Sequence, residues 1–161
     1  MFGVCMRYCK NKEEAEDVLQ EGFIKIFLSM KKFEFKGEGS LTNWIRRIMV
    51  NAAINYHRDN LKHCYHTDIE TISISAEELP NYNTEQISEE PASPEKIMEI
   101  VQMLPLGYRM VFNLYVFEKY THKNIAEILK ISESTSKTQL MKARKMIKQK
   151  IAEIQKISVA I

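Results

Sequence analysis

Apolar residues recur every three to four positions in several stretches of the chain, a spacing that predicts amphipathic helices. The predicted helices span residues 12–32, 40–60, 93–105, 108–118, 121–130 and 132–150. In the first of them, the residues predicted to face the core are Ala15, Val18, Leu19, Phe23, Ile26, Phe27 and Met30. A loop, FEFKGEGS, separates the first two helices, because its glycines and serine favour a turn.

The same spacing predicts which side of the later helices is buried. In the second helix the core positions are Leu41, Ile45, Ile48 and Ala52, with Trp44 at the boundary. In the last helix they are Leu140, Ala143, Ile147 and Ile151. Since helical periods dominate, the pattern predicts an all-α fold of two small helical domains.

Residues 61–93 lack a sustained period and separate the two groups of helices. Residues 68–95 hold eight acidic residues and no lysine or arginine, whereas the rest of the chain holds 23 basic and 13 acidic residues. This distribution predicts an acidic flexible linker without a packed core, between two basic ends that suit nucleic acid.

Composition excludes several classes of protein. The apolar runs are short and interrupted by charge, so we expect no membrane insertion. Three cysteines, an odd number, favour a reducing cytoplasm over a disulfide framework. The HCYH stretch at residues 63–66 could join His57, Cys5 and Cys9 in a zinc site, but the spacing fits no common template. We therefore expect no metal, cofactor or catalytic residue, and no enzymatic activity.

Two short helices near the C-terminus have the layout of a helix-turn-helix. THKNIAEILK and SESTSKTQLMKARKMI are separated by a tight turn, and Thr121 and Ser132 are placed to cap them. The outer face of the second helix predicts contacts with the DNA major groove. Its candidate residues are Lys137, Thr138, Met141, Lys142 and Lys145. The alternative interpretation is an ordinary solvated lysine face.

The helix predicted at residues 40–60 carries a second polar stripe. Arg47, Asn51, Asn55 and Arg58 fall on one narrow face, and aromatic residues lie nearby at Trp44 and Phe35. Arginine binds phosphate, asparagine bonds base edges and aromatic rings stack on unpaired bases, so the stripe predicts a single-stranded nucleic-acid site. An amphipathic surface helix with a structural tryptophan is the alternative.

Three collinear motifs resemble bacterial RNA polymerase sigma factors of the extracytoplasmic-function (ECF) class. They are EDVLQEGFIKIF, FKGEGSLTNWIRRIMVNAAINYHR and LPLGYRMVFNLYVFEKYTHKNIAEILKISESTSKTQLMKARK. The resemblance implies that residues 1–66 recognise and melt the −10 promoter element and bind polymerase. It further implies that residues 67–93 are a linker threading through the polymerase channel, and that residues 94–161 bind the −35 element. Its implied partners are core RNA polymerase and promoter DNA, and it allows an anti-sigma factor.

The matched positions imply roles for particular residues. Asp17, Gln20, Glu21 and Phe23 match the helix that docks on the polymerase clamp. Phe35 and Asn51 match the pocket for a flipped −10 base, and Trp44 matches the tryptophan of the melting helix. Lys137, Thr138, Met141 and Lys142 match positions that contact the −35 duplex.

The sequence departs from the family pattern at three places. Ser136 occupies a position that is usually apolar and buried, and Lys130 occupies a turn position where glycine is frequent and a positive φ is expected. Members of the class are also expected to carry one more helix before the residue that matches Met1.

The rival functions are a stand-alone helix-turn-helix regulator, which would not need the Arg47 stripe, and a polymerase-binding adaptor, which would not need the basic final helix.

Overall fold

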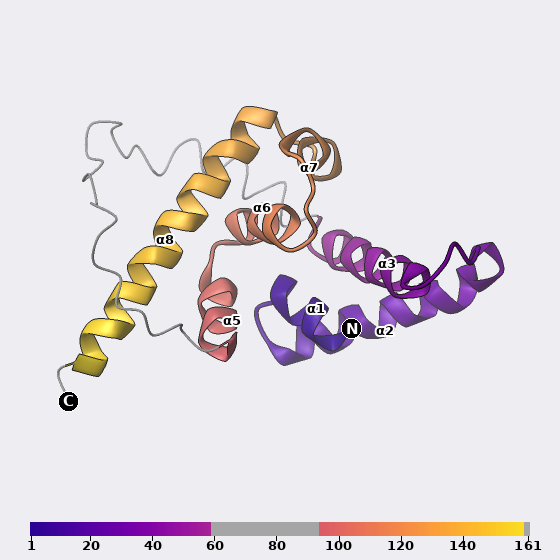
Figure 1. The fold of residues 1–161 in the computed structure, drawn as a ribbon, viewed down its shortest axis with the longest axis horizontal. Coiled ribbons are helices and arrows are strands. Elements are labelled where there is room, and N and C mark those ends of the chain that lie inside the picture. The colour runs from indigo at the N-terminus through magenta and orange to yellow at the C-terminus, as the bar shows by residue number, and fades with distance from the viewer. Residues whose placement is uncertain (59–93, 160–161) are drawn as a thin grey trace.

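The computed structural model describes residues 1–58 and 94–159, and all of its regular elements in these two ranges are helical. In chain order they are α1 (Phe2–Tyr8), α2 (Lys12–Ser29), the short 3₁₀ helix η1 (Met30–Lys32), α3 (Ser40–Tyr56), α5 (Pro94–Met103), α6 (Leu106–Val116), α7 (His122–Leu129) and α8 (Glu133–Val159). Figure 1 shows their arrangement. The all-α prediction is confirmed, while the predicted linker at residues 67–93 and the HCYH stretch lie outside the described residues.

Helices α2 and α3 form a hairpin against which α1 packs. Asn11 caps α2, because its side chain accepts a hydrogen bond from the Glu14 backbone N–H at 2.8 Å. Gly22 lets the two long helices approach closely, since a Cβ there would collide with the side chain of Met49. Burial of Ala15, Val18 and Ala52 confirms these predicted core positions.

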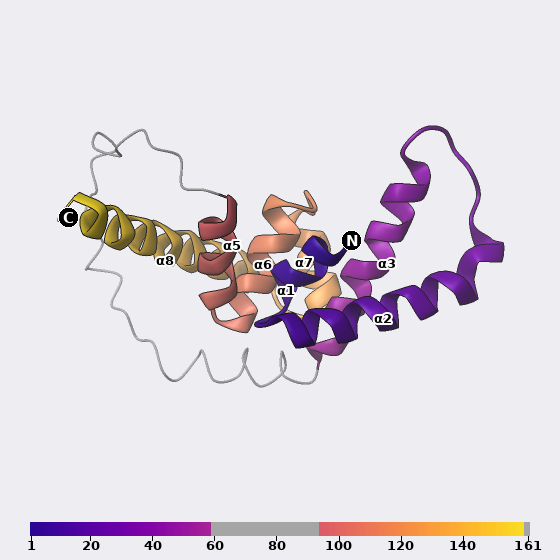
Figure 2. The same ribbon diagram turned by 90° about the horizontal axis from the view of Figure 1, so that it is seen from below.

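The prediction of the core face fails at the far end of this hairpin. Phe23, Phe27, Met30 and Leu41 are exposed, with Phe27 retaining 72% of its surface. Figure 2 shows the reason: α2 and α3 diverge towards the loop that joins them, so no described element covers the end of α2. Helical periodicity gives the apolar face of a helix but does not say whether a partner reaches it.

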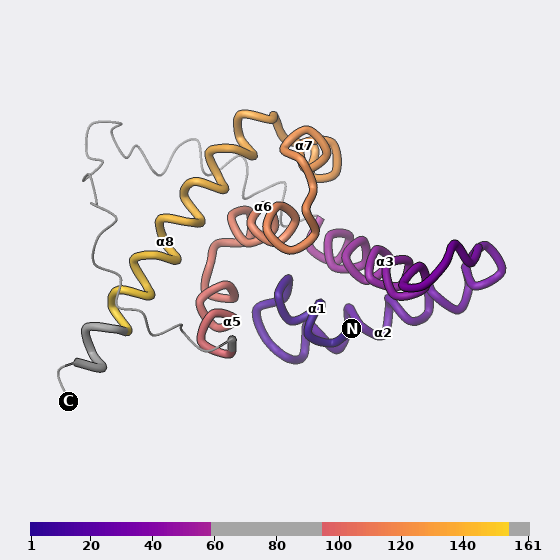
Figure 3. The backbone as a smooth tube through the Cα atoms, viewed as in Figure 1, coloured from indigo at the N-terminus to yellow at the C-terminus, as the bar shows by residue number. Residues whose placement is uncertain are grey.

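The C-terminal helices place α7 and α8 side by side on α6. Thr121 caps α7 by accepting a hydrogen bond from the Asn124 backbone N–H at 3.2 Å, and Ser132 caps α8 by accepting one from Thr135 at 3.0 Å. Both caps were predicted. Helix α8 then continues well beyond residue 150 as one long rod, which Figure 3 follows from the turn after α7 towards the C-terminus.

The two groups of helices share one hydrophobic core through α1. Cys5, Tyr8 and Cys9 belong to the same buried cluster as Met110 and Val111 of α6. Polar bonds reinforce this junction. The Asn113 amide donates to the Arg7 carbonyl at 2.6 Å, and the Gln102 amide donates to the Met6 carbonyl at 3.0 Å. Among the described helices, none is long and apolar enough to cross a membrane.

Candidate nucleic-acid interface

The predicted polar stripe on α3 lies on an exposed face of the helix. Arg47, Asn51, Asn55 and Arg58 are all exposed, whereas Met49, Ala52 and Ala53 on the opposite side are buried. Helix α3 ends at Tyr56, earlier than predicted, so Arg58 follows the helix rather than extending its stripe. The first three side chains therefore form one continuous polar ridge that a ligand can reach.

Aromatic residues stand at the beginning of the same helix. Trp44 is half-buried and packs against Phe33, with ring centroids 5.2 Å apart, which confirms its boundary position. Phe35 retains 76% of its surface and lies in the loop where Gly37 and Gly39 adopt positive φ values of 106° and 79°. These left-handed turns suit glycine, and they bring the loop back so that α3 can begin at Ser40.

The helix-turn-helix carries a smaller exposed face than the sequence predicted. Lys137, Thr138 and Met141 are exposed on α8, and Lys137 pairs with Glu133 at 2.8 Å. Lys142 and Lys145 are half-buried, and the Lys142 ammonium lies 5.9 Å from the ring centre of Tyr108. The predicted residues that are exposed therefore lie near the N-terminal end of α8.

Two of the three departures from the family pattern, at Lys130 and Ser136, have a local explanation. Lys130 ends α7 in the left-handed conformation, with φ 56°, as predicted. Ser136 is fully buried, and its hydroxyl lies 2.9 Å from the Nδ1 atom of His122. The ring of His122 in turn stacks on Tyr115 at 4.7 Å. The polar group at this buried position therefore has a partner, which removes most of the cost of burying it.

The residues matched to polymerase docking lie along one exposed side of α2. Asp17, Gln20 and Phe23 are exposed, and half-buried Glu21 forms an ion pair with Lys25. The apolar surface continues beyond Phe23, because Ile24, Phe27 and Leu28 are exposed as well. Neighbouring exposed apolar residues such as these are typical of a protein-binding surface.

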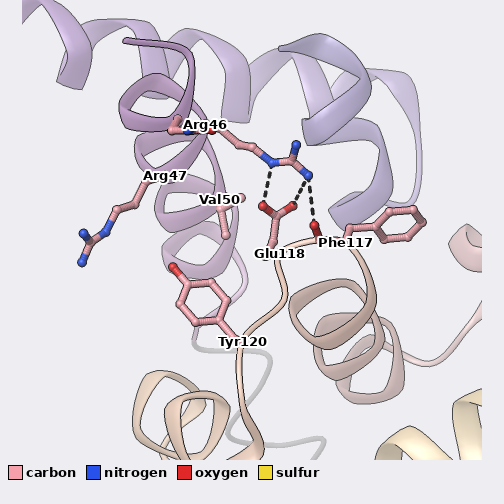
Figure 4. A pocket seen from close by; sticks show the side chains of 7 residues that line it. Arg46, Arg47, Val50, Phe117, Glu118 and Tyr120 are labelled. Carbon is pink, nitrogen blue, oxygen red and sulfur yellow. Dashed lines mark hydrogen bonds and ion pairs between the residues drawn. The ribbon is translucent and has the colours of Figure 1, made fainter. Parts of the chain in front are cut away.

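Arg46 points away from the exposed stripe and into the junction between the two groups of helices. Its Nε atom donates to Glu118 Oε2 at 2.7 Å, and its Nη2 atom donates to Glu118 Oε1 at 3.1 Å and to the Phe117 carbonyl at 3.3 Å. Figure 4 shows this pair beside Arg47, which projects in the opposite direction. Together with Val50 and Tyr120, these side chains line a cavity of about 310 Å³.

Glu118 also binds a second arginine. Arg7 Nη2 lies 3.2 Å from Glu118 Oε1, and the Arg7 guanidinium stacks over the Phe117 ring at 4.4 Å. Hydrogen bonding to Glu118 raises the pKa of Arg46, whereas burial lowers the pKa of Arg7. The Glu118 side chain retains only 8% of its surface, so one buried carboxylate connects α1, α3 and the turn after α6.

Comparison with known proteins gives a family assignment. The model for Sigma-70 region 2 matches residues 1–62, and the model for Sigma-70 region 4 matches residues 95–147. This chain belongs to the sigma-70 family and is an ECF sigma factor. It is therefore a transcription-initiation factor, which binds core RNA polymerase and directs promoter recognition, DNA melting and initiation.

Similar proteins carry the same class name. The chain is 28% identical over 159 residues to the ECF RNA polymerase sigma-E factor of Haemophilus influenzae, covering 92% of this chain and 80% of that protein. It is also 28% identical over 164 residues to the ECF sigma factor SigW of Bacillus subtilis, covering 96% and 84%. A solved structure of the sigma factor RpoE in complex with the anti-sigma factor NepR, from Bartonella quintana, matches with a TM-score of 0.54 and 18% identity over 95% of this chain and 89% of that chain. At this identity the match concerns the fold alone.

Glu118, which binds two arginines in this ECF sigma factor, was missed by sequence reasoning. Glu118 lies in the turn between α6 and α7, far in sequence from both arginines. From sequence, an acidic residue in a short turn is expected to be exposed to solvent. Its partners, Arg7 and Arg46, are identified only when α1 and α3 are packed against it. Lys119, which adopts a φ of 60° in the same turn, carried no signal either.

Proposed function

We propose that α3 holds the unpaired strand of the −10 element and that α8 reads the −35 duplex. The exposed ridge of Arg47, Asn51 and Asn55 carries the first half of this proposal. An asparagine amide can both donate to and accept from the Watson–Crick edge of an unpaired base. Arg47 and Arg58 then provide phosphate contacts, and Trp44 and Phe35 provide aromatic surface at the start of the helix.

For the −35 element, the residues at the beginning of α8 make the closest contacts. Lys137, Thr138 and Met141 are exposed just beyond the turn, where a recognition helix enters the major groove. Lys142 and Lys145 lie beside them and reach phosphates by swinging away from the protein surface. The exposed side of α2, with Asp17, Gln20, Glu21 and Phe23, docks on core polymerase.

The closed packing of the two groups of helices requires a rearrangement on the promoter. Elements named −35 and −10 lie roughly 25 base pairs apart, which is about 85 Å of duplex. In the structure, however, Arg46 of α3 and Glu118 beside α7 are in direct contact at 2.7 Å. One copy of the chain that reads both elements therefore has to separate these groups and break the Glu118 contacts.

Run-off transcription with core polymerase tests the proposal. With the chain added, we expect discrete start sites on a promoter library and no activity without polymerase, since we propose a non-enzymatic cytoplasmic factor. The same core polymerase without the chain is the control. Equal initiation at the same sites in the control would overturn the proposal. Sequence-specific duplex binding by the free chain alone, with no effect on initiation, would favour a stand-alone regulator.

An anti-sigma factor is a further proposed partner. The support is that RpoE, which shares the fold, was solved together with the anti-sigma factor NepR. Co-purification from the native cell, with the exposed residue Phe27 replaced by serine as the comparison, would detect such a partner and locate its contact.

A further inference from the structure

Three side chains that can bind metal meet where α1, α2 and α3 come together. Cys9 Sγ, a carboxylate oxygen of Glu14 and a ring nitrogen of His57 all lie within 4.8 Å of one another. Cys9 directly follows α1, Glu14 lies in the first turn of α2, and His57 directly follows α3. Each ligand candidate is therefore positioned by the end of a different helix.

Burial separates this cluster from an accidental group of surface residues. Cys9 is fully buried and His57 retains 4% of its surface, while Glu14 is half-buried at the entrance. The Nε2 atom of His57 is buried without a hydrogen-bond partner in the structure. Burying such a group without a partner costs free energy, and a further species bound within this cluster would offset that cost.

Neighbouring groups hold the ligand candidates in place. Glu14 Oε2 accepts a hydrogen bond from the Lys10 backbone N–H at 3.0 Å, which leaves the other oxygen available. The carbonyl of Cys9 accepts a bond from Arg109 Nη1 at 3.4 Å, and the His57 ring packs edge-on against Tyr56 at 5.0 Å. Such supporting contacts orient the ligands of protein metal sites.

The donor set suits one class of ion. We propose that Cys9, Glu14 and His57 bind a zinc ion, with water at the fourth position on the open side of Glu14. Zinc accepts sulfur, nitrogen and oxygen ligands at about 2.0–2.3 Å in a tetrahedron, which places the ligand atoms about 3.3–3.8 Å apart. The cluster has to contract by about 1 Å to reach that geometry, which side-chain rotation of Glu14 and Cys9 can supply.

Charge balance agrees with the geometry. Burial lowers the pKa of His57, so its ring is neutral at pH 7 and can donate a lone pair. Burial, assisted by Glu14, raises the pKa of Cys9 to about 12, so the thiol keeps its proton until a cation displaces it. With zinc bound, the Cys9 thiolate and the Glu14 carboxylate neutralise the two positive charges of the ion, so the site carries no net charge.

The test uses the full-length chain after chelator treatment. We expect one zinc ion per chain by native mass spectrometry, and a sulfur-to-metal charge-transfer band when cobalt(II) replaces zinc. At zinc concentrations a hundred times the Kd, the Tm should rise by about 5–10 °C. Absence of stoichiometric binding would overturn the proposal and leave a buried thiol and imidazole with a structural role only.

Matched variants locate the ion. C9S, E14Q and H57Q should each weaken zinc binding by about tenfold or more, with C9S also removing the cobalt charge-transfer band. E14Q is the mildest, because glutamine keeps the shape and can still accept from Lys10, so unchanged helix content by circular dichroism would separate lost binding from lost folding. C5A and C64S are the controls and should bind as the wild type does. Binding that survives C9S, or that C64S alone abolishes, would show that the ion sits elsewhere.

Discussion

Replacing Glu118 with glutamine should loosen the contact between the two groups of helices. The carboxylate receives three charge-assisted hydrogen bonds, two from Arg46 and one from Arg7, at 2.7–3.2 Å. Breaking a fully buried pair costs about 3–5 kcal/mol. Arg46 retains 35% of its side-chain surface and can rehydrate, so about 2–3 kcal/mol is the better estimate here. At tenfold for each 1.4 kcal/mol, this corresponds to roughly a 30- to 150-fold rise in the population of molecules whose two groups of helices are separated.

Hydrogen exchange of backbone amides measures that population directly. Amides of α1 that are protected only in the closed packing should lose protection by the same 30- to 150-fold, whereas amides of α7 and α8 should not change. E16Q is the control, because Glu16 pairs with Lys12 at 3.6 Å on the surface and its loss should cost less than about 1 kcal/mol. Unchanged protection of α1 in E118Q would refute the assigned role of Glu118, and equal loss in all helices would show general destabilisation instead.

Three further variants address the two surfaces proposed to read DNA and the buried residue Ser136. Asn51→Ala should impair promoter opening more than duplex binding, because the amide of Asn51 is exposed on α3. Permanganate footprinting should show that a pre-melted template restores the open complex of this variant. An equal defect on the pre-melted template would assign Asn51 to docking or folding. Lys137→Ala should reduce the dependence of the holoenzyme's promoter affinity on salt concentration by about one unit of log–log slope. Glu133→Gln, which removes only the pair with Lys137, should leave this slope unchanged. Equal slopes for Lys137→Ala and wild type would mean that this lysine faces solvent. Ser136→Ala should lower the free energy of unfolding by about 1 kcal/mol in urea, because it removes the bond to His122; a gain in stability would contradict that account.

Local sequence signals predicted local structure well. Thr121 and Ser132 cap α7 and α8, and Lys130 ends α7 with a positive φ, because a cap or a turn depends on residues within four positions of it. The exposed stripe of Arg47, Asn51 and Asn55 was predicted for the same reason, since one helical period fixes which residues share a face.

Features that depend on distant partners were not predicted. Phe27 matches the apolar period of α2 but is exposed, since α3 diverges before reaching it. Glu118 and Arg46 are 72 positions apart, so their contact does not follow from a single helical pattern. The sequence suggested Cys9 and His57 as possible zinc ligands, but not Glu14, which the packing of the helices places beside them. Such contacts become visible only when the helices are packed. The roles assigned to Lys142, Lys145 and the polymerase-docking residues remain predictions, because they concern partners outside the chain.

The position of α1 has a consequence for how the chain is made. Arg7 is synthesised before the residue that binds its guanidinium, because Glu118 follows 111 positions later. At about 5–20 residues per second, the nascent N-terminal helix waits on the order of 5–20 s for that partner. During this interval the apolar side of α1 that will contact α6 is uncovered. The ribosome-bound chain therefore passes through a stage in which α1 can pack on α2 and α3 but not yet on α5 and α6, and these last contacts form after the second half has been synthesised.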